Sequence, residues 1–225
     1  TVSGTVVACR LWQFGGAELS PMCENIKQFA ITGGIACGKS TVAAWLPQWG
    51  GCVLDADDVA HALQAPGGAV VDPIRMAFGP SVIQTDGAVD RAALGRLVFR
   101  DPAALAVLNG VVHPLVRQRI KAWLKEPVAS GIRFRAVVIP LLFEVGWDTA
   151  EWDAVIAIVC DADEQIRRLG QRGLDAAEAR RRLAAQMSCA EKARCADYVI
   201  WNNGTVEALQ EAAARLFQAL LEKKT

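Results

Sequence analysis

Short apolar runs alternate with amphipathic stretches along the chain, and this alternation predicts an α/β fold. The apolar runs are near-continuous, as in parallel strands that are buried on both faces of a sheet. They predict strands at residues 29–32, 51–55, 134–139, 154–159 and 198–201. The periodic stretches predict helices at residues 41–46, 59–63 and 206–221, and a mostly helical region from residue 66 to about 127. The chain is therefore expected to form a five-stranded parallel sheet flanked by helices.

The helical region between residues 66 and 127 has its own polar landmarks. Asp90 is expected to cap one helix, and Asp101-Pro102 to begin the next, because proline suits a first helical turn. Another apolar face follows His113-Pro114. Inserted between the second and third strands, this region suggests a substrate-binding subdomain in which Arg91 and His113 are the notable polar residues. The alternatives are a surface ion pair for Arg91 and a helix-entry position for His113.

A glycine-rich segment lies between the first predicted strand and the first predicted helix. Residues 33–40, Gly-Gly-Ile-Ala-Cys-Gly-Lys-Ser, fit the phosphate-loop pattern G-x-x-x-x-G-K-[ST]. In such a loop, backbone N–H groups surround a polyphosphate and the helix N-terminus adds partial positive charge. Lys39 is then expected to reach the β- and γ-phosphates of a nucleotide, and the Ser40 hydroxyl to ligate Mg²⁺. The alternative is a chance glycine turn.

Carboxylates follow two of the predicted strands. Asp55, Asp57 and Asp58 come at the end of the second strand, and Glu144 follows the third. Ligands of open α/β sheets bind at the carboxyl ends of strands, so these side chains are expected near the phosphate loop. Asp57 is a candidate general base for an attacking hydroxyl group. The alternatives are helix capping by Asp57 or Asp58 and an ordinary loop carboxylate at Glu144.

The segment from residue 161 to 186 is dense in arginine. Its arginines are Arg167, Arg168, Arg172, Arg180, Arg181 and Arg182. Two helical segments separated near Gly173 can bring some of them onto one face of a mobile lid, where arginines neutralise charge on a transferred phosphoryl group. The alternatives are a solvated helix face and a nucleic-acid patch; the absence of interleaved aromatic residues weakens the second.

Composition narrows the class of partner. The 225 residues include 24 Lys and Arg against 24 Asp and Glu, so no global field favours nucleic acid or an anionic membrane. No apolar run approaches the roughly 18 residues that a transmembrane helix needs. The seven cysteines, without C-x-x-C spacing, fit reduced thiols in a cytosol. We therefore expect a cytoplasmic protein, a monomer or weak oligomer, with no nucleic-acid or membrane partner.

The domain organisation follows from these elements. Residues 1–21 have no sustained period, and we expect Met22 to be the natural start and the preceding stretch an upstream extension, with a signal peptide as the alternative. Residues 22–225 are then one domain. Its expected parts are a core of residues 22–64, 128–162 and 190–225, a helical acceptor-binding insertion at 65–127 and a lid at 163–189.

A phosphate loop alone does not separate kinases from GTPases or motor ATPases. The sequence contains no Asn-Lys-x-Asp guanine signature and no strand ending in the paired acids of a hydrolytic motor. The compact core, the insertion and the arginine-rich segment favour a small-molecule kinase. The alternatives are another P-loop kinase, acting on a nucleoside or sugar acid, and a nucleotide-sensing module.

Taken together, these motifs resemble the dephospho-CoA kinase family, over residues from about Lys27 to Gly204. The matching stretches are Thr32-Gly33-Gly34-Ile35, Gly38-Lys39-Ser40-Thr41, Asp55-Ala56-Asp57, Ala60-His61, Asp90-Arg91, Leu94-Gly95, Val98-Phe99, His113-Pro114, Pro140-Leu141-Leu142-Phe143-Glu144, Gln165-Ile166, Arg168-Leu169, Arg172, Arg182, Gln186-Met187, Ala196-Asp197-Tyr198-Val199-Ile200, Asn202 and Gly204. The resemblance implies ATP- and Mg²⁺-dependent phosphorylation of the ribose 3′-hydroxyl of dephospho-CoA, the last step of coenzyme A biosynthesis. It also implies a nucleotide-binding core, a helical domain for the CoA precursor and a lid.

The resemblance also implies roles for individual residues. Asp57 matches the family's general base, and Lys39 and Arg168 act with it in catalysis. The nucleotide is expected to contact Gly34, Ile35, Ala36, Cys37, Gly38, Lys39, Ser40, Thr41 and Arg172, with Ser40 (or Thr41 nearby) on Mg²⁺. The acceptor is expected to contact Asp57, Arg91, His113, Glu144 and Arg182.

One departure from the family lies inside the loop, where glycine and serine are usual and this chain has Ala36 and Cys37. Backbone N–H groups surround the phosphate, so alanine is tolerable if its φ stays negative. Cys37 lies at a helix N-terminus. There we expect a lowered thiol pKa and sensitivity to oxidation.

Overall fold

The computed structural model describes residues 26–98 and 101–223. Residues 1–21, which we expected to be an upstream extension, lie outside this described part. The chain divides into two compact units, one comprising residues up to Leu54 and from Pro127 onward, the other Asp55–Glu126. Among the helices described, none is long and apolar enough to cross a membrane.

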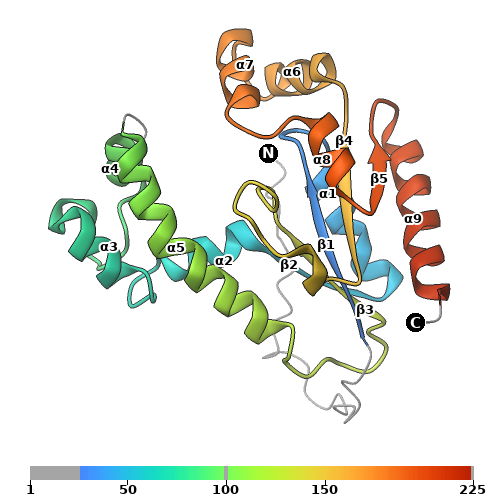
Figure 1. Cartoon of the computed structure of the whole chain (residues 1–225), viewed down its shortest axis with the longest axis horizontal. Helices are drawn as coiled ribbons and strands as arrows, with labels where there is room; N and C mark the ends of the chain where they lie inside the picture. Colours follow the sequence, from blue (N-terminus) through green and yellow to red (C-terminus); the bar gives the residue numbers. More distant parts are fainter. Residues whose placement is uncertain (1–25, 99–100, 224–225) are drawn as a thin grey trace. The chain divides into compact units, whose positions relative to one another are not determined.

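The first unit is an α/β layer structure built on one sheet (Figure 1). Its strands are β1 Lys27–Gly33, β2 Gly51–Asp55, β3 Phe134–Val138, β4 Ala154–Val159 and β5 Tyr198–Trp201. Its helices are α1 Lys39–Trp45, α6 Ala162–Gln171, α7 Ala176–Ala184, α8 Cys189–Cys195 and α9 Val206–Glu222, with short 3-10 turns at Leu46–Trp49 and Thr149–Glu151. The sheet order is β2-β3-β1-β4-β5, and β1 runs parallel to both β3 and β4. The predicted five-stranded parallel sheet is confirmed.

One face of this sheet packs on α1 and α9. Phe29 of β1, Phe134 of β3 and Phe217 of α9 are each almost fully buried and meet in one aromatic cluster. The ring centroids of Phe134 and Phe217 lie 5.3 Å apart, and those of Phe29 and Phe217 lie 5.7 Å apart. Burying such a side chain is worth about 1.5–3 kcal/mol, so this cluster anchors the last helix to the central strands.

The second unit is helical. Its helices are α2 Ala56–Leu63, α3 Val71–Phe78, α4 Arg91–Val98 and α5 Pro102–Trp123, with a 3-10 turn at Pro80–Val82. The Asp90 carboxylate accepts the N–H groups of Ala92 and Ala93, which confirms it as the cap of α4. This unit includes α2, which the sequence placed in the core.

The alternative of a helix-entry position for His113 is wrong, since α5 continues through His113 and Pro114. Proline inside a helix costs about 3 kcal/mol because it removes a backbone hydrogen bond. The buried residues Val112, Val116 and Ile120 continue one apolar face across the proline. Their packing keeps the helix continuous, as tertiary packing does for most helices in proteins. His113 is therefore a mid-helix residue.

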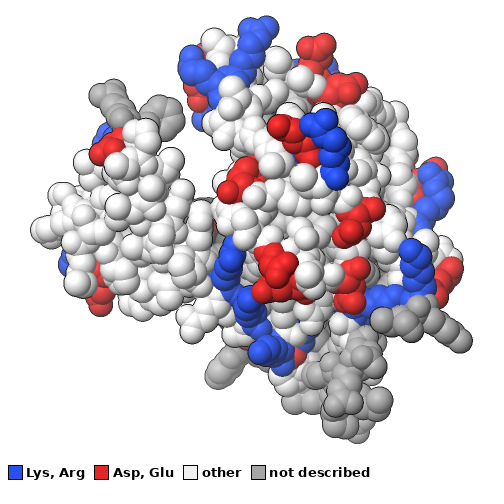
Figure 2. Space-filling view, viewed as in Figure 1, with Lys and Arg blue, Asp and Glu red and all other residues white. Residues whose placement is uncertain are grey.

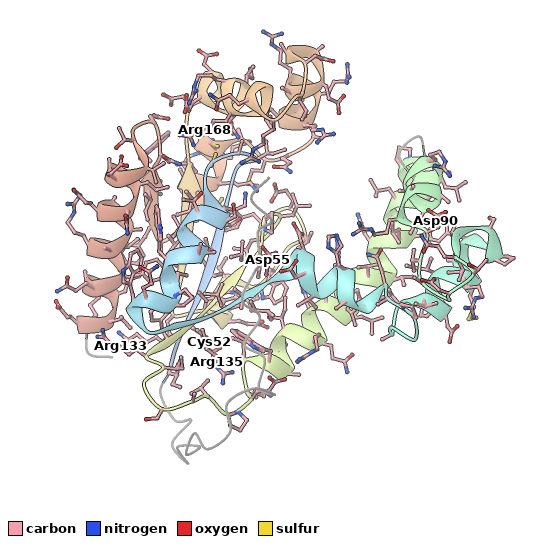
Figure 3. The ribbon with its side chains drawn as sticks, turned by 180° about the vertical axis from the view of Figure 1, so that it is seen from behind. Cys52, Asp55, Asp90, Arg133, Arg135 and Arg168 are labelled. Atoms are coloured by element: carbon pink, nitrogen blue, oxygen red, sulfur yellow. The ribbon has the colours of Figure 1, made fainter. Side chains whose placement is uncertain are left out.

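The alternative reading, in which Asp57 or Asp58 caps α2, is also wrong. Asp55 is the cap, because its carboxylate accepts the N–H of Asp57 at 2.8 Å (Figure 3). Asp57 and Asp58 lie exposed in the first turn, where negative charge suits the helix dipole. Capping therefore leaves the Asp57 carboxylate available for another role.

Candidate active site

The phosphate loop lies at the centre of the sheet because it follows β1, the middle strand. The carboxyl ends of parallel strands meet at one edge of the sheet, so the segments that follow β3, β4 and β5 begin at the same edge as the loop. Gly33 is required at the entry to the loop: a Cβ atom there would lie 1.9 Å from the carbonyl oxygen of Ile158. Gly38, with φ 98°, ends the loop as the N-cap of α1.

Three side chains from distant segments hold consecutive carbonyl groups of the loop. Gln165 Nε2 donates to the carbonyl of Ile35 at 2.7 Å. An Arg168 guanidinium nitrogen donates to the carbonyl of Ala36 at 3.2 Å, and Asn202 Nδ2 to that of Cys37 at 2.8 Å. In a trans peptide the N–H of the next residue points the opposite way. The bonds to the Ile35 and Cys37 carbonyls therefore turn the N–H groups of Ala36 and Gly38 away from the holding side chains, whereas the N–H of Cys37 donates to the carbonyl of Gly34 at 3.3 Å.

Lys39 and Ser40 stand where the motif predicts them, at the start of α1. Lys39 Nζ donates to the carbonyl oxygens of Gly33 and Gly34 at 3.0 and 2.8 Å. The Lys39 side chain therefore extends back toward the first two residues of the loop. Ser40 is exposed, so its hydroxyl can reach a ligand at the loop.

Ala36 corrects one expectation about the loop, since its φ is +59° and not negative. An L-residue in this left-handed region costs about 1–2 kcal/mol. Two features hold it there: the bond from Arg168 to its carbonyl, and the packing of its methyl group with Leu169 of α6 and Ala179 of α7. The alanine therefore links the loop to the helices of the expected lid.

Cys37 corrects a second expectation. Its thiol pKa is raised to about 11, chiefly because the thiol is hydrogen-bonded to Cys160 and also because it is buried. Its Sγ lies 3.1 Å from Cys160 Sγ and 3.4 Å from Cys189 Sγ. Lys39 and the bond from Cys189 lower the pKa, but they do not outweigh the first effects. The position of Cys37 at a helix N-terminus predicts only the effect of the helix on the thiol pKa. Contacts with the thiols of Cys160 and Cys189 determine the direction in which this pKa shifts.

The arginines of the expected lid occupy different settings. Arg168 pairs with Glu164 at 2.6 Å, and a second guanidinium nitrogen donates to the carbonyl of Asn202 at 2.8 Å (Figure 3). Arg172 is exposed at the end of α6. Arg182 pairs with Glu178 at 2.9 Å on α7, where Lys and Arg side chains gather on the surface (Figure 2). Within the described part of the chain, Arg168 contacts the phosphate loop, whereas no such contact is found for Arg172 or Arg182.

A cavity of about 520 Å³ opens beside the loop, within the first unit. Its walls include Gly34, Ile35, Cys160, Arg180, Cys189 and Trp201. Arg180 belongs to the arginine-rich segment, but no role was predicted for it from the sequence. The exposure of Trp201 at this cavity was not predicted from the sequence.

Glu144 is joined to α8 by a residue that sequence reasoning missed. Its carboxylate lies 2.8 Å from Nζ of Lys192, a fully buried ammonium that also donates to the carbonyl of Pro140 at 2.6 Å. The same carboxylate accepts the N–H of Met187 at 3.1 Å. Glu144 is thus part of a network that joins the segment after β3 to α8.

The second unit has a cavity of its own, of about 240 Å³. Asp57, His61 and Arg91 all line it, which brings two of the predicted acceptor residues together. His113 is not among the residues that line this cavity. It is half-buried on α5, and burial, followed by the charge of Arg117, lowers its pKa, which favours the neutral imidazole.

Comparison with known proteins agrees with these features. The family model described as dephospho-CoA kinase matches residues 28–208. A dephospho-CoA kinase of Geobacillus kaustophilus is 47% identical over 178 residues, which are 79% of this chain and 88% of that protein. One from Anaeromyxobacter dehalogenans is 43% identical over 196 residues, 87% of this chain and 92% of that protein.

Solved structures agree as well. The crystal structure of TT1252 from Thermus thermophilus superposes with a TM-score of 0.72 at 35% identity, covering 88% of this chain and 99% of that one. Dephospho-CoA kinase from Campylobacter jejuni gives a TM-score of 0.58 at 25% identity, covering 86% and 97%. The chain belongs to the dephospho-CoA kinase family, as its motifs predict.

Proposed function

We propose that this chain transfers the terminal phosphoryl group of ATP to the ribose 3′-hydroxyl of dephospho-CoA, giving CoA and ADP. The observation that carries the donor half of the proposal is the loop itself. Its carbonyl groups at Ile35, Ala36 and Cys37 are each bonded to a side chain of another segment, which fixes the backbone of a loop that carries the phosphate-binding motif and so supports a site for the ATP phosphates there. Family membership supports the acceptor half.

The donor phosphates bind at the loop amides of residues 34–41. Lys39, which bonds to the carbonyl groups of Gly33 and Gly34, exchanges those acceptors for phosphate oxygens, which carry full negative charge and bind an ammonium more strongly. The residues also fit Mg²⁺. An exposed hydroxyl at Ser40, next to the loop, belongs to the oxygen ligands that this ion takes together with nucleotide phosphates. When bound, the ion neutralises charge on the phosphates.

Asp57 takes the proton of the acceptor hydroxyl. Its carboxylate is exposed on the first turn of α2 and is not used as the helix cap, a role that Asp55 fills. It lines the cavity that also contains His61 and Arg91. Arg91 supplies a guanidinium that can hold a phosphate oxygen of the acceptor, whose diphosphate group carries negative charge. The cavity therefore offers a base and a phosphate ligand on the same unit.

The remaining predicted residues have different proposed tasks. We propose that Arg168 shapes the loop through its bond to the Ala36 carbonyl and that Arg172, exposed at the end of α6, contacts the nucleotide. Arg182 and His113 stay predictions as acceptor ligands. We propose that Glu144 acts through the buried Lys192, by fixing the segment after β3, and not as a free carboxylate. A cytoplasmic location and a monomeric or weakly oligomeric state also stay predictions.

An ADP-release assay coupled to a visible readout tests this function. The purified chain is given ATP and Mg²⁺ with one acceptor at a time: dephospho-CoA, adenosine, gluconate or shikimate. We expect release only with dephospho-CoA. Release with another acceptor would favour a different small-molecule kinase, and ATP binding without any acceptor-dependent release would favour a nucleotide sensor.

A further inference from the structure

Three cysteines from three separate segments meet at the phosphate loop. Cys37 lies in the loop, Cys160 directly follows β4, and Cys189 begins α8. Cys37 Sγ is 3.1 Å from Cys160 Sγ and 3.4 Å from Cys189 Sγ, and all three are free thiols. Cys37 and Cys160 are buried, whereas Cys189 is half-buried. The phosphoryl transfer proposed above uses none of the three thiol groups.

We propose that Cys37 and Cys160 form an oxidation site, which a hydroperoxide converts into a disulfide that disables the phosphate loop. The two sulfur atoms are already in contact, and their approach has to be completed by movement of the chain. A disulfide joins sulfur atoms about 2.05 Å apart, so this pair closes by about 1 Å. Cys160 and Cys189 form part of the wall of the cavity of about 520 Å³ beside the loop, which admits a molecule as small as hydrogen peroxide.

The thiol that reacts first is Cys160, because it lines the cavity beside the loop and Cys37 does not. Its pKa is lowered, chiefly by the hydrogen bond with Cys37, and further by the positive charge of Arg168. The pKa of Cys37 is raised to about 11, and that of Cys189 is raised, in each case chiefly by a hydrogen bond with another cysteine of the cluster. Cys160 is therefore the thiol that most readily becomes the nucleophilic thiolate.

The disulfide forms in two steps. The Cys160 thiolate attacks one oxygen of the peroxide, the O–O bond breaks, and the products are Cys160 sulfenic acid and hydroxide, which takes up a proton to become water. The Cys37 sulfur then attacks the sulfenic sulfur. Its proton leaves with the sulfenic hydroxyl as a second water, and the S–S bond forms. In total, two thiols are oxidised by two electrons and one peroxide is reduced to two waters.

The disulfide acts on the loop more than on the sheet. Cys160 follows the fully buried strand β4, which is paired on both sides, whereas Cys37 lies in a loop held by a few hydrogen bonds. Closing the pair therefore pulls Cys37 and its neighbours toward β4 and strains the bond from Asn202 to the Cys37 carbonyl. The loop amides then no longer match the phosphate positions. Losing even one charge-assisted hydrogen bond weakens ATP binding by about tenfold or more.

The test treats the full reduced chain with a molar excess of hydrogen peroxide and then blocks the remaining thiols. Peptide mass spectrometry without reduction is expected to find a Cys37–Cys160 linked peptide, two hydrogens lighter than its two parts. ATP binding, measured by calorimetry on the same sample, is expected to weaken by about tenfold or more and to recover with dithiothreitol.

Two matched variants separate this pair from general oxidation. Cys160→Ser is expected to bind ATP as the untreated protein does and to keep that affinity in peroxide; Cys160→Ala serves if the serine variant does not fold. Cys189→Ser is expected to form the same link and to lose affinity as the parent does. Three results in the parent protein would each overturn the proposal. They are a Cys37–Cys189 link instead of the Cys37–Cys160 link, overoxidised Cys160 without any link, and a Cys37–Cys160 link that leaves ATP affinity unchanged.

Discussion

Arg168 donates a hydrogen bond to the carbonyl oxygen of Ala36, 132 positions away in the sequence. The same guanidinium pairs with Glu164 and bonds to the backbone of Asn202. A lid arginine that meets only the transferred phosphoryl group would have no such contacts. We therefore propose that Arg168 is a positioning residue for the phosphate loop.

Arg168→Ala is expected to raise the Kd for ATP by about tenfold or more, because charge-assisted hydrogen bonds worth roughly 1.5–3 kcal/mol no longer hold the loop. Arg167→Ala is the matched control. Arg167 pairs with the same Glu164 but is exposed, and Kd should stay within about twofold. Calorimetric titration with ATP measures both. A lower kcat with unchanged Kd would contradict the positioning role and place Arg168 at the transferred group.

Asp57→Asn is expected to lower kcat by about a hundredfold or more and to leave ATP binding intact, since an amide cannot take the proton of the acceptor hydroxyl. Asp58→Asn, its exposed neighbour in the same helical turn, controls for loss of negative charge at the start of α2. Steady-state kinetics with saturating ATP separate the two variants. Near-normal turnover of Asp57→Asn would remove Asp57 from the reaction.

Much of this architecture follows from local sequence. The strands at residues 51–55, 154–159 and 198–201 have the predicted bounds, because near-continuous apolar runs are read directly from the chain. Lys39 and Ser40 are likewise fixed by a pattern of adjacent residues. The helix-entry alternative for His113 fails because packing of a long buried face carries α5 through Pro114, where a local rule would end the helix.

The parts of the site that were missed are contacts between distant segments. Gln165 and Asn202 match family motifs but had no assigned role, and Lys192 was not singled out at all. Only the folded sheet edge brings these three residues to the loop or to Glu144. The cysteine cluster is of the same kind. The seven cysteines have no C-x-x-C spacing in the sequence. Three of them nevertheless converge, because their segments follow or cover neighbouring strands. The order of the strands would have been needed to foresee either.

Glu144→Gln is expected to destabilise the fold by about 3–5 kcal/mol, because it leaves the ammonium of Lys192 buried without its charged partner. Urea unfolding measures the change. The double variant Glu144→Gln with Lys192→Met should recover part of the loss, since both charges are then gone. If the single and double variants were equally destabilised, the two side chains would not be coupled.

Stability should fall in acid through Glu164. Hydrogen bonds from Arg167 and Arg168, with Arg167 the larger cause, lower the pKa of this carboxyl from 4.5 to about 2. A depressed folded pKa contributes stability that is present above the ordinary value and is lost as the pH falls from about 4.5 to about 2. Glu164→Gln should therefore show a shallower loss of unfolding free energy over this range. Parallel pH profiles for the two proteins would contradict the assignment.

The identity of the phosphorylated product tests the account most directly. The chain is incubated with dephospho-CoA, Mg²⁺ and ATP, and the purified product is analysed by mass spectrometry and phosphorus NMR. One added phosphoryl group on the ribose 3′-hydroxyl, formed in equal amount with ADP, is the predicted result. ADP formed without a phosphorylated acceptor, or a phosphoryl group on any other position, would contradict it.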